Sequence, residues 1–218
     1  MKKFAVILAG NGVYDGSEIH EAVLTLLAID KSGASYKAFA PDIKQFLVIN
    51  HFVKRHTKET RNVFVESSRL VRGELELLSQ FRAEDFDALV LPGGYGVAKN
   101  LCTFGYDGAK MKVNADVSNA VLAMHKLNKP IGAMCIAPVL LAKLIPNATI
   151  TIGTDEETEK AVQEMGATNI RTQHGDVVVD KQNNLFTTPC YMLEATIKDI
   201  ALDTENLIRD MLLAMDTD

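Results

Sequence analysis

"FAVILA", residues 4–9, is apolar at every position, and "ALVL", residues 88–91, has the same character further along the chain. A strand with one face in water alternates apolar and polar residues, whereas a strand of a parallel sheet is covered by helices on both faces. Short runs that are apolar throughout therefore indicate parallel strands at the centre of an α/β sheet. The pattern predicts a doubly wound, mainly parallel sheet with helices on both faces.

Longer helical patterns alternate with such short runs, as this architecture requires. The spacing of apolar residues predicts helices over residues 19–31, 113–127, 157–165 and 197–215. Further candidate strands are residues 36–40, 131–134, 149–152, 177–179 and 185–187. We expect one domain that spans residues 1–218.

Residues 41–82 interrupt this alternation. Charged and apolar residues mix in this segment, and residues 60–72 are predicted to form an extra helix. No low-complexity linker sets the segment apart from the rest of the chain. We interpret it as an insertion that packs on the same domain.

Composition excludes several classes of function. The chain has 218 residues, 47% of them hydrophobic, which is enough for one large core, and its formal net charge is −5. A nucleic-acid partner requires clustered lysine and arginine, and a membrane-spanning helix requires about 20 apolar residues in a row; neither is present. The N-terminal apolar run is too short for a signal peptide. Since Cys102, Cys135 and Cys190 lack paired or metal-like spacing, we expect a cytoplasmic protein that binds neither nucleic acid nor membrane.

Ligands of parallel sheets bind at the carboxyl ends of the strands, where "IGAM" is followed by Cys135. The segment "IAPVLLAKLI" then reads as a helix, with Pro138 in its first turn. A thiol at a strand-to-helix turn faces free helix N–H groups, which predicts a nucleophile whose pKa lies below about 8.5. The alternative is a small buried hydrophobe, and on this motif alone both interpretations stay open.

Two further strand ends carry candidate groups. In "LPGGYG", Gly93 and Gly94 allow backbone N–H groups to approach a ligand and hold an oxyanion, although a PGG sequence also suits an ordinary tight turn. In "DGSEIHEAV", Ser17 is the predicted N-cap, and Glu18 suits the positive end of the helix dipole. Glu21 lies deeper in the helix. A partly desolvated carboxyl there would have a raised pKa and could shuttle protons.

With these motifs in this order, the sequence resembles the PfpI superfamily, the single-domain relatives of class I glutamine amidotransferases. It is most similar to the ElbB branch, also called ES-type or isoprenoid-biosynthesis-like. The segments that carry the resemblance are "GNGVYDGSEIHEAVLTLLAI", "NVFVESSRLVRGE", "LPGGYGVAKNL", "MCIAPVLLAK", "TIGTD" and "TTPCYML". They extend over nearly the whole chain, including the insertion.

The resemblance implies a flavodoxin-like fold and a role for each candidate residue. Cys135 matches the family's nucleophile and Glu21 its partner glutamate, while Gly93, Gly94 and the backbone of Ile136 match the oxyanion donors. It also implies glyoxalase activity without glutathione, which converts glyoxal to glycolate and methylglyoxal to lactate, or a protein deglycase activity that is read out in this way. The implied protein is a homodimer that acts on a small dicarbonyl and needs no metal or organic cofactor.

One feature departs from the protease-like and amidotransferase-like relatives, which place a histidine base directly after the cysteine or downstream of it. Here position 136 is isoleucine, and no late His-x-Glu occurs. The histidines are scattered at positions 20, 51, 56, 125 and 174, where surface or loop roles account for them. Protease and amidotransferase functions are therefore disfavoured.

The residues that remain suit a cysteine hemithioacetal mechanism with Glu21 as the single acid/base. A rival function uses the same thiol without catalysis, either as a redox or stress sensor or in a module that binds a small ligand. Fold alone does not separate these functions. Turnover of glyoxal that disappears in Cys135→Ser would favour the enzyme.

Overall fold

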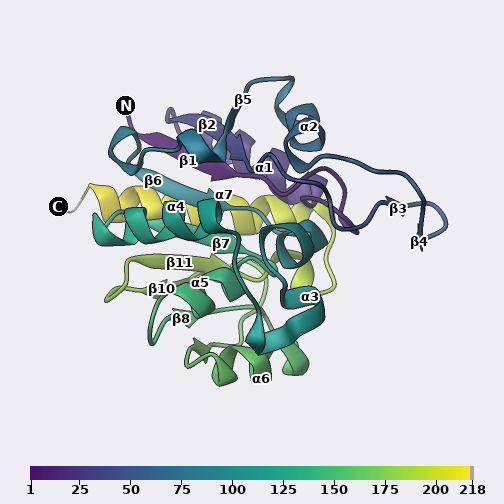
Figure 1. Ribbon diagram of the computed structural model, residues 1–218. Helices are drawn as coiled ribbons and strands as arrows, with labels where there is room; N and C mark the ends of the chain where they lie inside the picture. Colours follow the sequence, from purple (N-terminus) through teal and green to yellow (C-terminus); the bar gives the residue numbers. More distant parts are fainter. Residues whose placement is uncertain (217–218) are drawn as a thin grey trace.

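The computed structural model describes residues 1–216 and contains a central sheet of seven strands within that range (Figure 1). The strands are β1 (Lys3–Ile7), β2 (Ser35–Ala40), β5 (Leu75–Leu77), β6 (Ala88–Leu91), β7 (Ile131–Met134), β10 (Val178–Asp180) and β11 (Leu185–Thr188). Their order across the sheet is β10-β11-β7-β6-β1-β2-β5, and only β10 runs antiparallel to its neighbour. The predicted doubly wound, mainly parallel sheet is confirmed.

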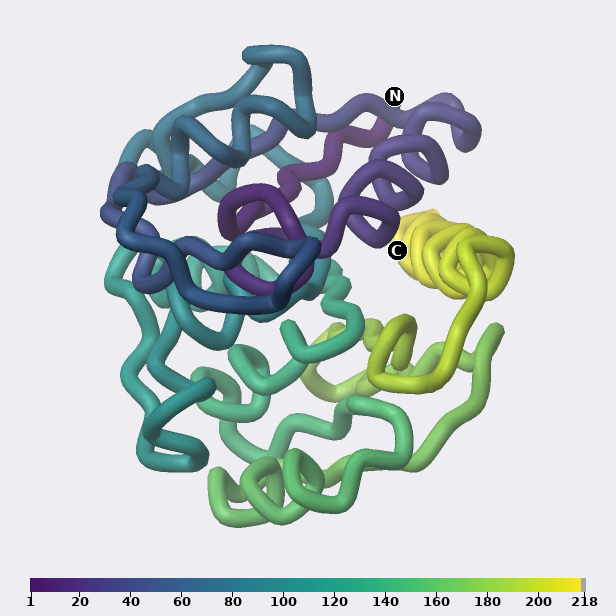
Figure 2. Tube along the Cα trace, turned by 90° about the vertical axis from the view of Figure 1, so that its right-hand side faces the viewer, coloured from purple at the N-terminus to yellow at the C-terminus, as the bar shows by residue number. Residues whose placement is uncertain are grey.

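Helices flank the sheet on both sides. They are α1 (Ile19–Lys31), α2 (Val63–Ser68), α3 (Phe104–Asp107), α4 (Ala115–Lys126), α5 (Pro138–Leu144), α6 (Glu156–Glu164) and α7 (Ile197–Met215). The bounds of α1 and α7 coincide with the prediction, and α4 and α6 lie within two residues of it. Figure 2 shows α7 beside α1, which it contacts along one face of the sheet.

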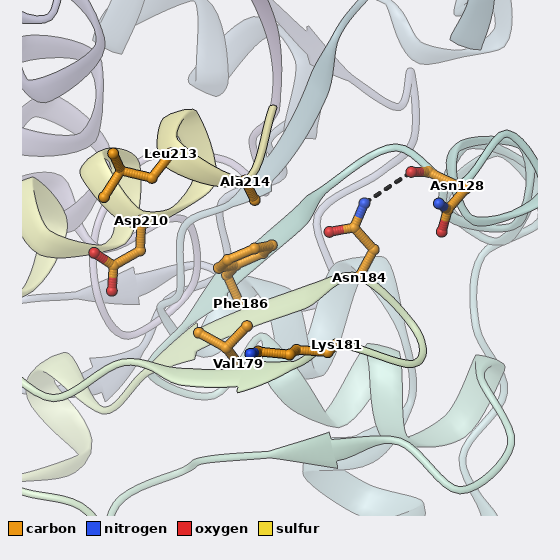
Figure 3. A pocket seen from close by; sticks show the side chains of 8 residues that line it. All are labelled: Asn128, Val179, Lys181, Asn184, Phe186, Asp210, Leu213 and Ala214. Carbon is orange, nitrogen blue, oxygen red and sulfur yellow. Dashed lines mark hydrogen bonds between the residues drawn. The ribbon is translucent and has the colours of Figure 1, made fainter. Parts of the chain in front are cut away.

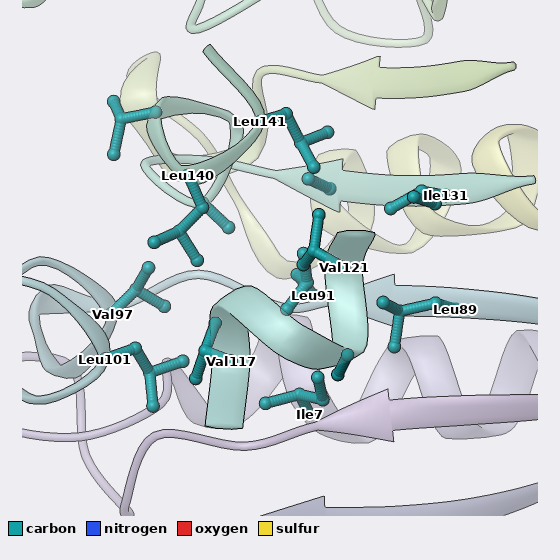
Figure 4. Packing of buried hydrophobic residues seen from close by; sticks show 14 of the residues in the cluster. Ile7, Leu89, Leu91, Val97, Leu101, Val117, Val121, Ile131, Leu140 and Leu141 are labelled. Atoms are coloured by element: carbon teal, nitrogen blue, oxygen red, sulfur yellow. The ribbon is translucent and has the colours of Figure 1, made fainter. Parts of the chain in front are cut away.

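The apolar strands are buried on both faces, as their composition indicates. In β1, Ala5 and Ile7 belong to the core cluster that includes α4 and α5, whereas Phe4 and Val6 belong to the cluster that includes α1 and α7. Figure 4 shows the first cluster, with Val117 and Val121 of α4 between Ile131 of β7 and Ile7 of β1 in the view. Because residues alternate between faces, a strand covered twice must be apolar at every position.

The predicted insertion, residues 41–82, contributes more to the fold than a helix. It supplies the edge strand β5, and it carries α2, which continues into a 3₁₀ turn over Arg69–Val71. It also forms a hairpin of β3 (Ile49–Asn50) and β4 (Arg55–His56), which projects from the body in Figure 1. Near the other edge, the predicted strand 149–152 is shorter: β8 (Thr149–Ile150) pairs with β9 (Thr168–Asn169) in a separate sheet.

The order of the strands places a crevice at one end of the sheet. From β1 the chain first proceeds to β2 and β5 on one side, then returns to β6 on the other side and continues to β7 and β11. The switch therefore lies between β1 and β6, and ligands of such sheets bind outside the carboxyl ends of the strands at this point. Within residues 1–216, no helix has the length and apolar character needed to cross a membrane.

Candidate active site

Cys135 lies at the turn between β7 and α5, and its backbone is strained. Its φ of +58° falls in the left-handed region, which is costly for a residue with a Cβ. The Cys135 N–H donates to the carbonyl of Thr188 over 3.1 Å, and Pro138 begins α5 as predicted. This turn has the geometry of the nucleophile elbow that the sequence predicted, and it presents the sulfur at a helix start.

The Glu21 side chain reaches Cys135 from the first turn of α1 and is fully buried. Its Oε2 accepts the N–H of Gly93 at 2.9 Å, and its Oε1 accepts the N–H of Tyr191 at 3.3 Å. The carboxyl also shares a hydrogen bond with the Cys135 thiol. Segments from four parts of the chain therefore meet at one carboxyl.

The helix start that positions Glu21 differs from the prediction. Glu18, not Ser17, is the N-cap of α1, and its Oε2 accepts the Glu21 N–H at 2.8 Å. Ser17 Oγ instead accepts the N–H of Ala9 at 2.8 Å, which ties the loop back to the end of β1. Glu18 thus acts at the helix start, and it also fixes the backbone of Glu21.

The two glycines after β6 allow the thiol and the carboxyl to meet. A Cβ at Gly93 would lie 2.5 Å from Cys135 Cβ and 2.7 Å from Glu21 Oε2, so any side chain there would separate the pair. Gly94 has φ +102°, and its N–H, like that of Ile136, bonds to the Cys135 sulfur. Because the Gly93 N–H already donates to Glu21, the donors that face the sulfur are those of Gly94 and Ile136.

Burial dominates the electrostatics of the pair. It raises the pKa of Glu21 to about 8, with a further contribution from the charge of Glu18, against which the bonds to Cys135, Tyr191 and Gly93 act. Burial and the charge of Glu21 raise the pKa of the Cys135 thiol well above its ordinary value, although the Gly94 and Ile136 N–H groups favour the thiolate. The expected low pKa of Cys135 is therefore wrong. Two groups this close in an apolar site titrate as a unit and do not both ionise.

A cavity of about 480 Å³ opens beside the Cys135 thiol. Gly94 and Ile136 line it next to the sulfur, and Tyr95 and Lys99 line it from the segment after β6. Tyr191 also reaches it, from the 3₁₀ turn that follows β11. Lys99 and Tyr191 were not predicted from the sequence, although both follow strand ends, as the predicted site residues do.

Among the described residues, no histidine hydrogen-bonds Cys135 or Glu21 and so takes the place of the histidine base of the protease-like relatives. His20 Nδ1 lies 2.8 Å from the Tyr191 hydroxyl, at the rim of the site. His174 Nδ1 lies 2.9 Å from Asp203, on α7. In the described part of the chain, neither Cys135 nor Glu21 hydrogen-bonds a histidine, and no group of three His, Cys, Asp or Glu side chains could hold a metal ion.

A second cavity, of about 540 Å³, lies near the amino ends of β7 and β11 and is lined by the end of α7 (Figure 3). In it, Asn184 Nδ2 donates to the carbonyl of Asn128 at 2.7 Å, and Phe186 and Val179 supply an apolar wall. No cysteine or histidine is among the described residues that line it. Although larger, it has no thiol among its described lining residues, and the candidate pair of Cys135 and Glu21 lies at the opposite end of the sheet.

Residues 60–190 match the DJ-1/PfpI family. The chain belongs to the DJ-1/PfpI family. This member is 41% identical over 208 residues to the "ES1 protein homolog, mitochondrial" of Rattus norvegicus, covering 91% of this chain and 78% of that protein. It is 38% identical over 220 residues to the human "Glutamine amidotransferase-like class 1 domain-containing protein 3, mitochondrial", covering 96% of this chain and 82% of that protein.

Solved structures agree with this assignment to the DJ-1/PfpI family. An isoprenoid biosynthesis protein with an amidotransferase-like domain from Ehrlichia chaffeensis superposes with a TM-score of 0.91 at 37% identity, over 97% of this chain and 99% of that one. The Rapid Encystment Protein of 24 kDa from Francisella tularensis, at 16% identity and a TM-score of 0.63, over 97% and 99% of the two chains, shares the fold. The fold is thus flavodoxin-like and of the class I glutamine amidotransferase type.

Proposed function

We propose that this protein is a glutathione-independent glyoxalase that converts glyoxal to glycolate and methylglyoxal to lactate. The observation that carries the proposal is the buried pair: a strained Cys135 in hydrogen-bond contact with a carboxyl, Glu21, whose pKa is raised to about 8. A carboxyl with a pKa near the working pH can both give and accept a proton. The protein deglycase activity that the resemblance also implies would use the same two groups, the Cys135 thiol and the Glu21 carboxyl.

The first step forms a bond between the Cys135 sulfur and one aldehyde carbon of glyoxal. The carbonyl electron pair moves to the oxygen, and the resulting oxyanion takes up the thiol proton to give a hemithioacetal. The N–H groups of Gly94 and Ile136, which face the sulfur, stabilise the charge as it develops. Gly93 serves a different purpose, because its N–H holds the Glu21 carboxyl.

Glu21 then moves a proton between the two carbons. As a carboxylate, it removes the C–H proton from the carbon attached to sulfur, which leaves an enediolate. The charged oxygen takes up the proton of the hemithioacetal hydroxyl, while Glu21 holds the proton that came from carbon. It returns a proton to the neighbouring carbon, and the product is a thioester of glycolate with Cys135. Water cleaves this thioester and restores the thiol, so glyoxal and one water become glycolic acid with no net oxidation or reduction. No step calls on a metal or an organic cofactor.

The rival role as a redox sensor has weaker support. Sensor cysteines are exposed and have low pKa values. Cys135 is only 7% exposed, and burial raises the pKa of its thiol. A role in binding a small ligand without turnover uses the same cavity, so turnover itself must separate it from catalysis.

The test is glycolate formation from glyoxal by purified protein, followed by NMR. The native chain is expected to turn over, whereas Cys135→Ser, which keeps the size of the side chain, is expected to form no glycolate above the buffer rate. Cys102→Ser is the matched control, since burial raises the pKa of Cys102 to about 12, and it should retain activity. Equal rates in the native chain and Cys135→Ser would refute the proposal.

The cytoplasm, as expected from the sequence, is the compartment that we propose for this activity. A thiol that must stay reduced supports the proposal. The names of two relatives include the word "mitochondrial". Fractionation of cells that produce the native chain, with antibody detection in each fraction, tests it; recovery in an organelle would contradict it.

A further inference from the structure

Lys99 lies in the π-helical turn Val97–Leu101, directly after the loop that carries Gly93 and Gly94. Its side chain lines the same cavity as Cys135. The ammonium group is 3.4 Å from the carbonyl oxygen of Tyr14 and 4.9 Å from the centre of the Tyr95 ring. A carbonyl and an aromatic face hold a cation in place without neutralising its charge.

No carboxylate of the described residues lies within 4.0 Å of the Lys99 ammonium. Partial burial lowers the pKa of Lys99, and the more distant charge of Asp15 opposes this effect. A cation that has lost part of its hydration and has no ion-pair partner attracts an anion more strongly than a fully solvated lysine does. Lys99 therefore makes one wall of the cavity electropositive.

Two acidic side chains also line the cavity. Asp155 and Glu157 line it from the N-terminal end of α6, where both are exposed and water screens their charges. Glu21 is protonated below its raised pKa of about 8. Among the described residues that line the cavity, Lys99 is therefore the only cation, and the carboxylates that oppose its charge are the screened Asp155 and Glu157 and the more distant Asp15.

We infer that Lys99 is a specificity-determining residue, and that the favoured substrates are carbonyl compounds that carry a carboxylate or another single anionic group. Lys99 binds the anionic group while the carbonyl carbon lies against the Cys135 sulfur. The size of the site supports this, because glyoxal would fill only a small part of a cavity of about 480 Å³. The inference deepens the proposed function by naming the substrate class of the same site.

Two alkylating agents that differ only in charge test the inference without turnover. Iodoacetate is an anion and iodoacetamide is neutral, and both attack the same sulfur, so their rate ratio at Cys135 cancels any change in the pKa of the thiol. Lys99→Met is expected to lower the iodoacetate-to-iodoacetamide ratio about five-fold, the size of one charge contact at a partly buried site. Lys99→Arg, which keeps the charge, should restore most of the native ratio.

Lys112→Met is the matched control, since Lys112 is exposed near this end of the sheet and does not line the cavity of Cys135. It should leave the ratio unchanged. An unchanged ratio in Lys99→Met, or an equal fall in Lys112→Met, would overturn the inference.

Titration calorimetry with pyruvate provides a measurement that needs no thiol. Pyruvate should bind to Cys135→Ser and bind about five-fold more weakly to the double variant with Lys99→Met. Equal binding would again count against Lys99. If glyoxal is not turned over but the charge preference stands, the glyoxalase proposal fails and the anion site remains.

Discussion

Glu21 is fully buried, and the charge that acts on it most strongly belongs to another carboxyl, Glu18. Such a site costs stability whenever the carboxyl must ionise, which supports the proposal that Glu21 is held there for chemistry. The sequence predicted both Cys135 and Glu21, because a strand end and a helix start locate them. It did not predict which way the Gly93 N–H points, since that direction follows from the three-dimensional path of the loop.

The raised pKa of Glu21 predicts a pH-dependent gain in stability for Glu21→Gln. Between pH 4.5, the ordinary value, and about 8, the folded chain keeps a proton that the unfolded chain has lost. The free energy of unfolding therefore falls as the pH rises through this window. Denaturant unfolding should show Glu21→Gln more stable than the native chain by at most about 4 kcal/mol at pH 8, and little different at pH 4.5.

The exposed Glu74 offers the matched control, since Glu74→Gln should change stability equally at both pH values. A stability difference for Glu21→Gln that is the same at pH 4.5 and pH 8 would show that Glu21 has an ordinary pKa.

Catalysis by Glu21→Gln should fall for a separate reason. The amide keeps the shape of the side chain and can still hydrogen-bond, but it cannot carry a proton between carbons. We expect glyoxal turnover to drop by about 10²–10⁴-fold, while mass spectrometry still detects the Cys135 adduct. Retained turnover would mean that another group moves the proton; His20→Gln, beside Tyr191, is the variant to compare.

At the scale of elements, the helices followed from periodicity more completely than the strands did. The apolar spacing of α1 and α7 defined their bounds because each packs one face against the sheet. β5 escaped prediction because it is a three-residue edge strand, half-buried throughout, without an apolar run. Residues 149–152 were expected as one strand, but only two of them form β8, and neither β8 nor its partner β9 joins the central sheet.

α7 is fastened to the loop before β10 through a fully buried carboxylate, Asp203. Its Oδ2 lies 2.9 Å from His174 Nδ1, and its Oδ1 accepts the N–H of Gly175 at 2.5 Å. Burial lowers the pKa of His174, but the bond to Asp203 and one to the Glu194 carbonyl outweigh it, so the pKa is raised from 6.5. The protonated imidazole therefore supports this attachment.

The stability that is lost when His174 is replaced should depend on pH. A raised folded-state pKa gives stability that is fully present below 6.5 and is lost as the pH rises through the folded value. His174→Gln should therefore destabilise the chain more at pH 6 than at pH 9, by about 1 kcal/mol or less. Thermal unfolding at the two pH values measures this. A larger loss at pH 9 would contradict it.

At the scale of the whole molecule, one apolar stripe remains uncovered. Ile19, Val23 and Leu27 lie four residues apart on α1, and each is more than 40% exposed. Residues four apart share one helix face, and exposed apolar stripes mark contact surfaces. We propose that a second copy of the chain covers this stripe, in the homodimer that the sequence resemblance implies. The stripe itself was not predicted, because the pattern of α1 does not show which apolar side chains the sheet leaves exposed.

A charge in the middle of the stripe should separate the two copies. Val23→Lys is expected to give a monomer by sedimentation at micromolar concentration, where the native chain sediments as a dimer. Val65→Lys, at an even more exposed apolar position on α2, should leave the dimer intact. A native chain that is monomeric, or a Val23→Lys chain that remains dimeric, would contradict the proposal.

The proton path through the buried pair is tested most directly by the turnover of glyoxal in D₂O. If Glu21 moves the proton through an enediol, it exchanges with solvent, and the product is glycolate with one deuterium on the carbon that bears the hydroxyl. NMR of the product should show this label for the native chain, and Glu21→Gln should form almost no glycolate. Unlabelled glycolate that Glu21→Gln forms as fast as the native chain would mean that hydrogen passes directly between the carbons, and it would contradict the assigned role of Glu21.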